Sequence, residues 1–139
     1  MKSFKEFITE SHPMYSMSFN DFDQSDNGWR SLPEKEHTRV ISGYIRKNKR
    51  KLEPQHHRIL NWHLGQTYAM RGDNKRAIRH MEKSSKSGDE QWNKYAKSTI
   101  AFLNNDKDEF EKHSGGENLN KETLDRLRQN FGKSYKDAY

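Results

Sequence analysis

The feature that most constrains the fold is a periodic apolar segment that ends in a helix-breaking turn. From about His56 to Met70, large apolar side chains recur four residues apart at Leu60, Leu64 and Tyr68. This spacing places them on one face of an α-helix. Arg71-Gly72-Asp73 follows directly, and a glycine at this position is typical of a helix C-terminus. The pattern therefore predicts a helix that ends at a tight turn.

A second, shorter apolar stripe follows the turn, between Asn74 and about Ser85. Its apolar members are Ala77, Ile78 and Met81. Two helices that are joined by so short a connection must be antiparallel neighbours. The sequence thus predicts an antiparallel helical hairpin as the centre of the fold.

The residues of this hairpin resemble a tetratricopeptide repeat. The positions that carry the resemblance are Leu64, Gly65, Tyr68, Gly72, Asp73 and Ala77. In such a repeat the small residues, here Gly65 and Ala77, lie where the two helices cross closely. The chain departs from the pattern at Trp62, which stands one residue late, and at Asp89, which replaces the closing proline. The resemblance implies an all-α fold, a short antiparallel helical-hairpin array of about five to six helices.

A weaker second unit is predicted farther along the chain. Its first helix contains Trp92, Tyr95, Ala96, Thr99, Phe102 and Leu103, and its second contains Phe110. Ser98 or Thr99 takes the place of the small glycine, and Asn104-Asn105-Asp106 forms the turn. After Gly115-Gly116, a final helix with Leu124, Leu127, Phe131 and Tyr135 would cap the array.

The segment before the array is predicted to divide into a linker and a helix start. Residues 11–30 are rich in Ser, Asn, Asp and Gly and are interpreted as a linker. Ser31 and Glu34 have the spacing of a capping box, which predicts a helix with Val40, Ile41, Tyr44 and Ile45 on its apolar face. The helical domain is therefore expected to span residues 31–139.

The first ten residues form a separate amphipathic peptide, because Ser11-His12-Pro13 should interrupt any helix that begins upstream. This peptide resembles the capsid-targeting peptide of internal head proteins of T-even bacteriophages, which carries Glu-Phe-Ile and ends in Glu. In that family a prohead protease cuts after the Glu. The resemblance implies processing at Ile8, Glu10 and Ser11. An ordinary N-terminal helix that packs Phe4, Phe7 and Ile8 on the domain is the alternative.

The composition excludes several classes of protein. The chain has no Cys, which rules out a disulfide framework and a thiol nucleophile. No apolar run approaches the roughly 18 residues that span a bilayer. Three Trp, six Tyr and seven Phe argue for a packed core although 33% of the residues are charged. A formal charge of +6 favours contact with nucleic acid, an anionic surface or an acidic partner.

Two groups of residues are candidates for binding. The run from Arg46 to Lys51 supplies its positive charges through Arg46, Lys47, Lys49, Arg50 and Lys51, which suit non-specific contact with DNA phosphates. A solvated helix end is the alternative, since cations are favoured there by the helix dipole. By the tetratricopeptide resemblance, a protein-binding groove would be lined by Ile59, Trp62, His63, Gln66 and Met70. The alternative is that neighbouring helices fill this groove and Trp62 belongs to the core.

No metal, cofactor or catalytic site is predicted. Residues 23–34 have the ligand spacing of an EF-hand loop, with Asp23 first, Gly28 sixth and Glu34 twelfth. Arg30 and Pro33 occupy unsuitable positions, so calcium binding is the weaker interpretation. The seven histidines lack the spacing of a His-Glu-x-x-His site, and no phosphate loop or nucleophile motif is present. The sequence predicts no enzyme.

Three functions remain open at the level of the sequence. The first is a phage internal head protein in the capsid interior, delivered with the DNA into the host cytoplasm, where it binds a host protein, for example in counter-defence. The second is an uncleaved tetratricopeptide-like adaptor in the cytoplasm with a host or phage protein partner. The third is a non-specific nucleic-acid-binding protein.

Overall fold

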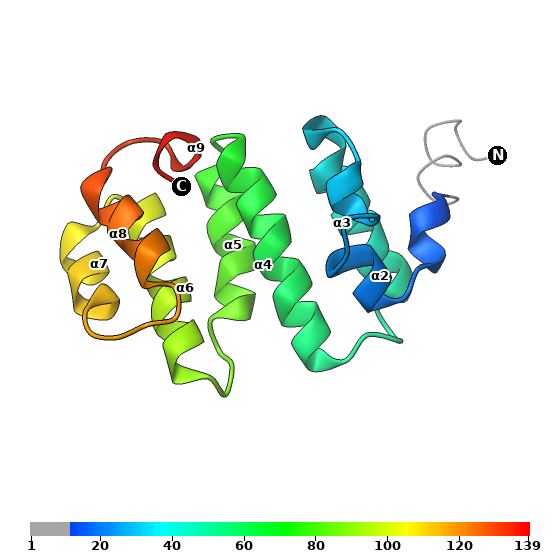
Figure 1. Ribbon diagram of the computed structural model, residues 1–139, viewed down its shortest axis with the longest axis horizontal. Helices are drawn as coiled ribbons and strands as arrows, with labels where there is room; N and C mark the ends of the chain where they lie inside the picture. Colours follow the sequence, from blue (N-terminus) through cyan, green and yellow to red (C-terminus); the bar gives the residue numbers. More distant parts are fainter. Residues whose placement is uncertain (1–11) are drawn as a thin grey trace. The chain divides into compact units, whose positions relative to one another are not determined.

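The computed structural model describes residues 12–139 and is all-α over that range (Figure 1). The predicted processing residues Ile8, Glu10 and Ser11 lie outside the described residues. The α-helices are α2 (Phe19–Asp23), α3 (Glu34–Asn48), α4 (Pro54–Met70), α5 (Asn74–Ser84), α6 (Glu90–Leu103), α7 (Lys107–Ser114), α8 (Lys121–Gln129) and α9 (Tyr135–Ala138). Two 3-10 helices, η1 (Pro13–Ser16) and η2 (Trp29–Ser31), precede α3. The predicted fold class is therefore confirmed. Within residues 12–139, no helix is both long and apolar enough to cross a membrane.

The chain divides into two compact units, which we describe separately. Unit 1 extends to Leu64 and unit 2 comprises Gly65–Tyr139. The division falls inside α4, so the first part of this helix belongs to unit 1 and its last part to unit 2. The sequence had instead predicted one helical domain over residues 31–139.

Unit 1 incorporates the segment that was predicted to be a linker. The ring of Phe22 is fully buried and stacks on Tyr44 of α3 with 3.8 Å between ring centroids. Tyr15 and Trp29 are also buried, at 7% and 9% exposure. The polar residues of this segment suggested a linker. Its buried aromatic rings, however, provide the apolar area that orders η1, α2 and η2 against α3. Residues 12–31 are thus part of the folded unit.

The predicted capping box at Ser31 is not formed. Ser31 lies in η2, where its hydroxyl donates a hydrogen bond to the carbonyl of Gly28 at 2.7 Å. The N-cap of α3 is Pro33, which has no side-chain hydrogen bond to the helix. The same carbonyl also accepts a hydrogen bond from the amide of Ser31 at 3.0 Å. This local contact engages the hydroxyl of Ser31 and competes with capping.

Unit 2 contains the close helix crossing that the sequence predicts. A Cβ atom on Gly65 would lie 2.8 Å from Cγ of Met81 and 3.0 Å from the carbonyl oxygen of Ala77. These distances leave no room for a side chain, so α5 approaches the end of α4 through Gly65. The turn between the two helices has Gly72 at φ +80°, a left-handed conformation that suits glycine.

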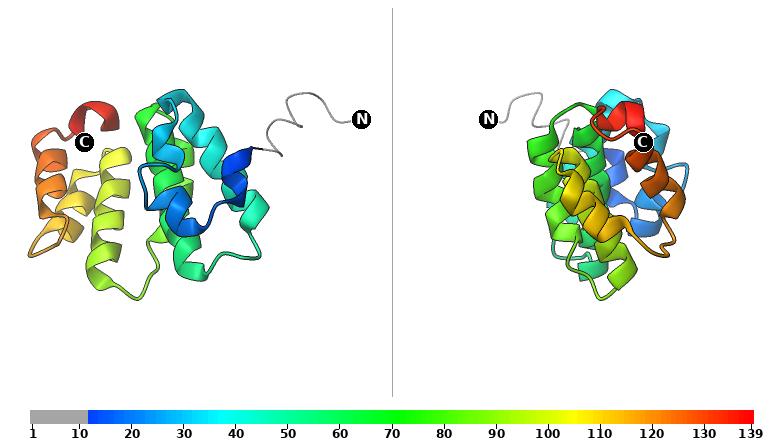
Figure 2. Two further views of the ribbon diagram at one scale, coloured as in Figure 1. Left: turned by 45° about the vertical axis from the view of Figure 1, so that its right-hand side comes forward. Right: turned by 90° about the vertical axis from the view of Figure 1, so that its left-hand side faces the viewer.

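The helices after α5 pack in sequence, with α6 against α5 and α7 against α6 (Figures 1 and 2). Asp89 and Asp106 cap α6 and α7 by accepting hydrogen bonds from the amides of Trp92 and Glu109. Ser98 and Thr99, which the sequence assigned to a small position, are both fully buried. The turn before α7 places Asn105 at φ 56°.

The predicted final helix is divided into two. The helix α8 ends at Gln129, the chain turns at Gly132 with φ +94°, and α9 begins at Tyr135. Phe131 therefore lies between the helices, although its ring still packs edge-on against Phe102 and Phe110. Helical spacing alone cannot distinguish one helix from two that present the same face.

Candidate functional site

The basic run lies at the C-terminal end of α3 and in the turn that follows it. The side chains of Arg46, Lys47, Lys49, Arg50 and Lys51 are all exposed. Asn48, in the middle of the run, is buried and its Nδ2 donates hydrogen bonds to the carbonyl oxygens of Tyr15 and Tyr44, both at 3.0 Å. This asparagine fixes the end of α3 against η1, so the cations are attached to an ordered backbone.

Part of the run lines a pocket of about 740 Å³ in unit 1. The lining residues are His12, Pro13, Tyr15, Ser16, Met17, Ser18, Phe19, Tyr44, Lys47, Asn48, Lys51, Leu52 and His56. Lys47 and Lys51 belong to this lining, whereas Arg46, Lys49 and Arg50 do not. Among the described residues, no carboxylate lines the pocket. The pocket is therefore a positively charged cavity that suits an anion.

One wall of the pocket is a pair of stacked aromatic rings. The rings of Phe19 and His56 lie 4.0 Å apart between centroids, with 17° between their planes. Phe19 starts α2, whose N-cap Ser18 accepts a hydrogen bond from the amide of Asp21 at 3.1 Å. Tyr44 fixes the adjacent segment, because its hydroxyl donates to the carbonyl of Met17 at 2.8 Å. These two hydrogen bonds fix the backbone directly before Phe19 and so position its ring.

His12 contributes a neutral donor to the pocket. Its Nδ1 accepts a hydrogen bond from the amide of Met14 at 3.1 Å, which leaves the ring proton on Nε2. Burial lowers the pKa of His12, and the positive charge of Arg39 lowers it further against a smaller opposite effect of Glu36. At neutral pH the ring is therefore uncharged, and the positive charge of the pocket comes from its lysines.

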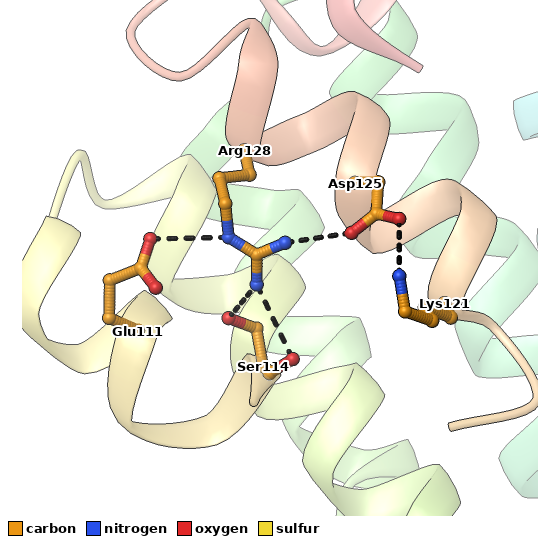
Figure 3. A network of polar contacts seen from close by, with 5 residues as sticks. All are labelled: Glu111, Ser114, Lys121, Asp125 and Arg128. Atoms are coloured by element: carbon orange, nitrogen blue, oxygen red, sulfur yellow. Dashed lines mark hydrogen bonds and ion pairs between the residues drawn. The ribbon is translucent and has the colours of Figure 1, made fainter. Parts of the chain in front are cut away.

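The cations of the basic run have no acidic partners among the described residues. No ion pair within residues 12–139 involves any of the five. In unit 2, by contrast, Arg128 of α8 bonds to Ser114, Glu111 and Asp125, and Lys121 also pairs with Asp125 (Figure 3). Within residues 12–139, the five cations of the basic run are therefore not compensated by ion pairs.

A second polar cluster in unit 1 is internal. Asp23 is fully buried, and its Oδ1 accepts hydrogen bonds from Nε1 of Trp29 at 2.9 Å and from Nδ1 of His63 at 2.8 Å. Its Oδ2 accepts one from Nε2 of Gln24 at 2.6 Å. Burial raises the pKa of Asp23, but the hydrogen bonds and the charge of His63 outweigh burial, and the pKa is lowered overall. Asp23 is an ionised carboxylate with every oxygen occupied.

This arrangement does not suit the calcium interpretation of residues 23–34. The first ligand of an EF-hand loop must direct its oxygen at the ion, yet both oxygens of Asp23 accept hydrogen bonds from other side chains. A Cβ atom on Gly28 would meet the carbonyl oxygen of Phe22 at 1.9 Å, so this glycine serves a close backbone approach. Within residues 12–139, no group of three or more acidic or histidine side chains is placed to hold a metal ion.

The residues of the predicted protein-binding groove lie along α4 and are largely engaged within the chain. Trp62 is only 4% exposed, and His63 is bonded to Asp23. Gln66 donates from Nε2 to the hydroxyl of Tyr135 at 2.9 Å. Ile59 and Met70 are partly exposed.

Sequence reasoning missed the aromatic wall of the pocket. The sequence places Phe19 in a linker and gives His56 no role beyond the start of a helix. The available signal was the presence of Tyr15, Phe19 and Phe22 in a segment that is otherwise polar. Aromatic side chains at such a density indicate packing and not a solvated linker.

Comparison with protein-family models, with curated proteins and with solved structures finds no match for this chain. The functional conclusion therefore depends on the chemistry of the site itself.

Proposed function

We propose that the protein binds nucleic acid through the basic run and the pocket beside it. The observation that carries this proposal is that Lys47 and Lys51 line a pocket to which residues 12–139 contribute no carboxylate. Like Arg46, Lys49 and Arg50, they form no ion pair within residues 12–139. Uncompensated cations attract the phosphates of a nucleic acid and release the counterions that are condensed on it.

The aromatic wall favours nucleic acid over an acidic protein segment as the ligand. Phosphates and aromatic bases alternate along a nucleic acid, and proteins that bind single strands combine a basic groove with stacking side chains. Lysine charges and the Phe19–His56 pair occur together in this pocket. The described lining residues also include no carboxylate, which is the usual acceptor for the exocyclic amino group of cytosine. Binding is therefore expected to be insensitive to base sequence.

The test is a titration of the purified full chain into a fluorescently labelled single-stranded oligonucleotide at several salt concentrations. Because at least three cations engage phosphates, the logarithm of the association constant should fall against the logarithm of salt with a slope of about −2 or steeper. Measurable affinity without salt dependence, or no affinity at low salt, would refute the proposal.

Packaging as a phage internal head protein is a second proposal, and it is compatible with the first. It is supported by the sequence of residues 1–10, with Ile8 and Glu10 at the positions of the family's cleavage pattern. A basic protein stored beside packaged DNA would be retained by the phosphates of the DNA. Mass spectrometry of purified virions tests this proposal. A mature chain that starts at Ser11 supports it, and absence of the protein from the particle contradicts it.

Binding of a host or phage protein, as a tetratricopeptide-like adaptor, is the alternative proposal. It is supported by the partial exposure of Ile59 and Met70 on α4. The variant Met70→Glu should then lose the partner in pull-down experiments, while Lys75→Glu, at an exposed position of α5, should retain it. Equal recovery with both variants would argue against this site.

A further inference from the structure

The pocket in unit 1 is more than a charged surface, because it combines volume, charge and an aromatic wall. Its volume of about 740 Å³ lies within the range of cavities that enclose small organic ligands. Flat contact with a phosphate backbone requires no such cavity. The pocket can therefore accommodate a group that projects from the backbone.

The lining residues separate into two kinds of contact. Lys47 lies in the last turn of α3, Lys51 lies in the turn that follows this helix, and both line the pocket. The Phe19–His56 pair lines it too, and each ring uses only one face for the other ring. A phosphate suits the lysines, and a planar base can extend the stacked pair. These two groups are joined in one nucleotide.

Several polar groups of the lining are already occupied. Both hydrogen bonds donated by Asn48 go to backbone carbonyls, and the hydroxyl of Tyr44 donates to Met17. The remaining donors include Nε2 of His12 and the hydroxyl of Ser16. With so few free polar groups, the pocket would contact a base through its face more than through its edge. Such contact accepts any base.

Resting on the proposed function, we infer that the pocket receives one unpaired nucleotide of a single-stranded nucleic acid. Its phosphate lies at Lys47 and Lys51, and its base stacks on the Phe19–His56 pair. Bases of an intact duplex are stacked on their neighbours and must be unpaired before they can enter a pocket. The protein should therefore prefer single strands to duplexes, which the exposed run alone would not require.

The test compares wild-type binding to three oligonucleotides of equal length, namely a single strand, its duplex, and a single strand with abasic sites throughout. The abasic strand retains the phosphates and lacks the bases. The single strand should bind at least about 10-fold more tightly than the other two, because stacking contributes per base. Equal affinity for all three would overturn the inference and leave the proposed function intact. No binding to any of them would overturn both.

Free nucleotides provide the second arm of the test. Thymidine monophosphate contains the same phosphate and base but no neighbouring nucleotides. It should compete with the labelled single strand only at concentrations well above those of the unlabelled single strand. Competition at equal concentration would assign the pocket to a free nucleotide and overturn the inference.

Matched variants locate the contact. Lys47→Gln with Lys51→Gln removes two charges from the pocket, and Lys49→Gln with Arg50→Gln removes two charges outside it. The first pair should weaken binding of both the single strand and the abasic strand more than the second pair does, because both strands carry the phosphate that Lys47 and Lys51 contact. Phe19→Leu should instead reduce the preference for the single strand over the abasic strand while the salt dependence stays unchanged. If circular dichroism shows that Phe19→Leu is not folded, His56→Asn provides the same readout. Equal losses of affinity in the two pairs, or an unchanged preference in the folded aromatic variant, would overturn the inference.

Discussion

The basic run of unit 1 and the α7–α8 surface of unit 2 both carry several positive charges, but they use them differently. On α8, Arg128 lies 2.8 Å from Asp125 and 3.3 Å from Glu111, and its Nη2 donates to the hydroxyl of Ser114 at 2.8 Å. In the basic run, Lys47 and Lys51 have no ion pair within the described residues. The charges of α8 connect two helices, and those of the run are available to a ligand.

The difference shows why net charge is a poor guide to a binding surface. A cation that is already hydrogen-bonded to carboxylates must break those contacts before it binds a phosphate. A cation that is solvated and unpaired exchanges only water and counterions. The formal charge of +6 for the whole chain does not distinguish these cases.

Charge reversal of the run should produce the largest effect. The variant with Lys47, Lys49, Arg50 and Lys51 all replaced by Glu should bind single-stranded DNA about 100-fold more weakly at low salt, because four phosphate contacts become repulsions. Its free energy of unfolding should fall by no more than about 1–2 kcal/mol, because Glu replaces cations that the dipole of α3 favours at this helix end. Anisotropy titrations and urea denaturation measure the two quantities. A large loss of stability would show that these charges are structural.

Substitution in the buried cluster around Asp23 should instead reduce stability. Asp23→Asn removes the charged carboxylate that accepts hydrogen bonds from Trp29 and His63. It should reduce the free energy of unfolding by about 2 kcal/mol. Urea denaturation measures this change, with Asp26→Asn as a control at an exposed position of the same loop. Equal stability of the two variants would show that the Asp23 network contributes nothing.

Removal of a paired charge from α8 should affect stability but not binding. Arg128→Met leaves Ser114 without its donor and should reduce the free energy of unfolding by about 1 kcal/mol. The matched variant Lys51→Met removes the same charge from the run and should leave stability unchanged while it weakens DNA binding. If Arg128→Met weakened binding as much as Lys51→Met, the contrast between the two surfaces would not hold.

The smallest effect is expected from mild acid. Because the pKa of Asp23 is lowered in the folded state, its stabilising contribution is complete above its unfolded pKa and is lost as the pH falls toward the folded value. Between pH 6 and pH 4 this group should therefore reduce stability by less than about 0.5 kcal/mol, with further loss only below pH 4. Denaturation of the wild type and of Asp23→Asn at several pH values measures the difference.

Much of the helical framework could be predicted from local pattern. The periodic apolar residues of α4 and α5 and the Gly72 turn are local features, and the structure confirms the helices and the crossing at Gly65. Local features also led to errors. Ser31 has the spacing of a cap but lies in a 3-10 turn, and Phe131 and Tyr135 continue a helical period across a break at Gly132.

The candidate site could be predicted only in part. The cations could be predicted as a group because five of the six residues from Arg46 to Lys51 are basic. Their exposure follows from their position at a helix end. The pocket was not visible, since it requires Phe19 to meet His56 and Tyr15 to meet Asn48, and both are contacts between distant parts of the sequence. Tertiary packing of aromatics determines these contacts, and neither composition nor periodicity specifies their partners.

The account is tested most directly by mapping the nucleic-acid contact on the protein. In nitrogen-15 NMR spectra of the full chain, addition of a short single-stranded oligonucleotide should shift the amide signals of residues 12–19 and 44–56, which contain the pocket lining and the basic run. The amides of residues 107–129, which contain α7 and α8, should remain in place. Shifts confined to residues 107–129, or distributed evenly over both surfaces, would contradict the assignment of binding to the unpaired charges.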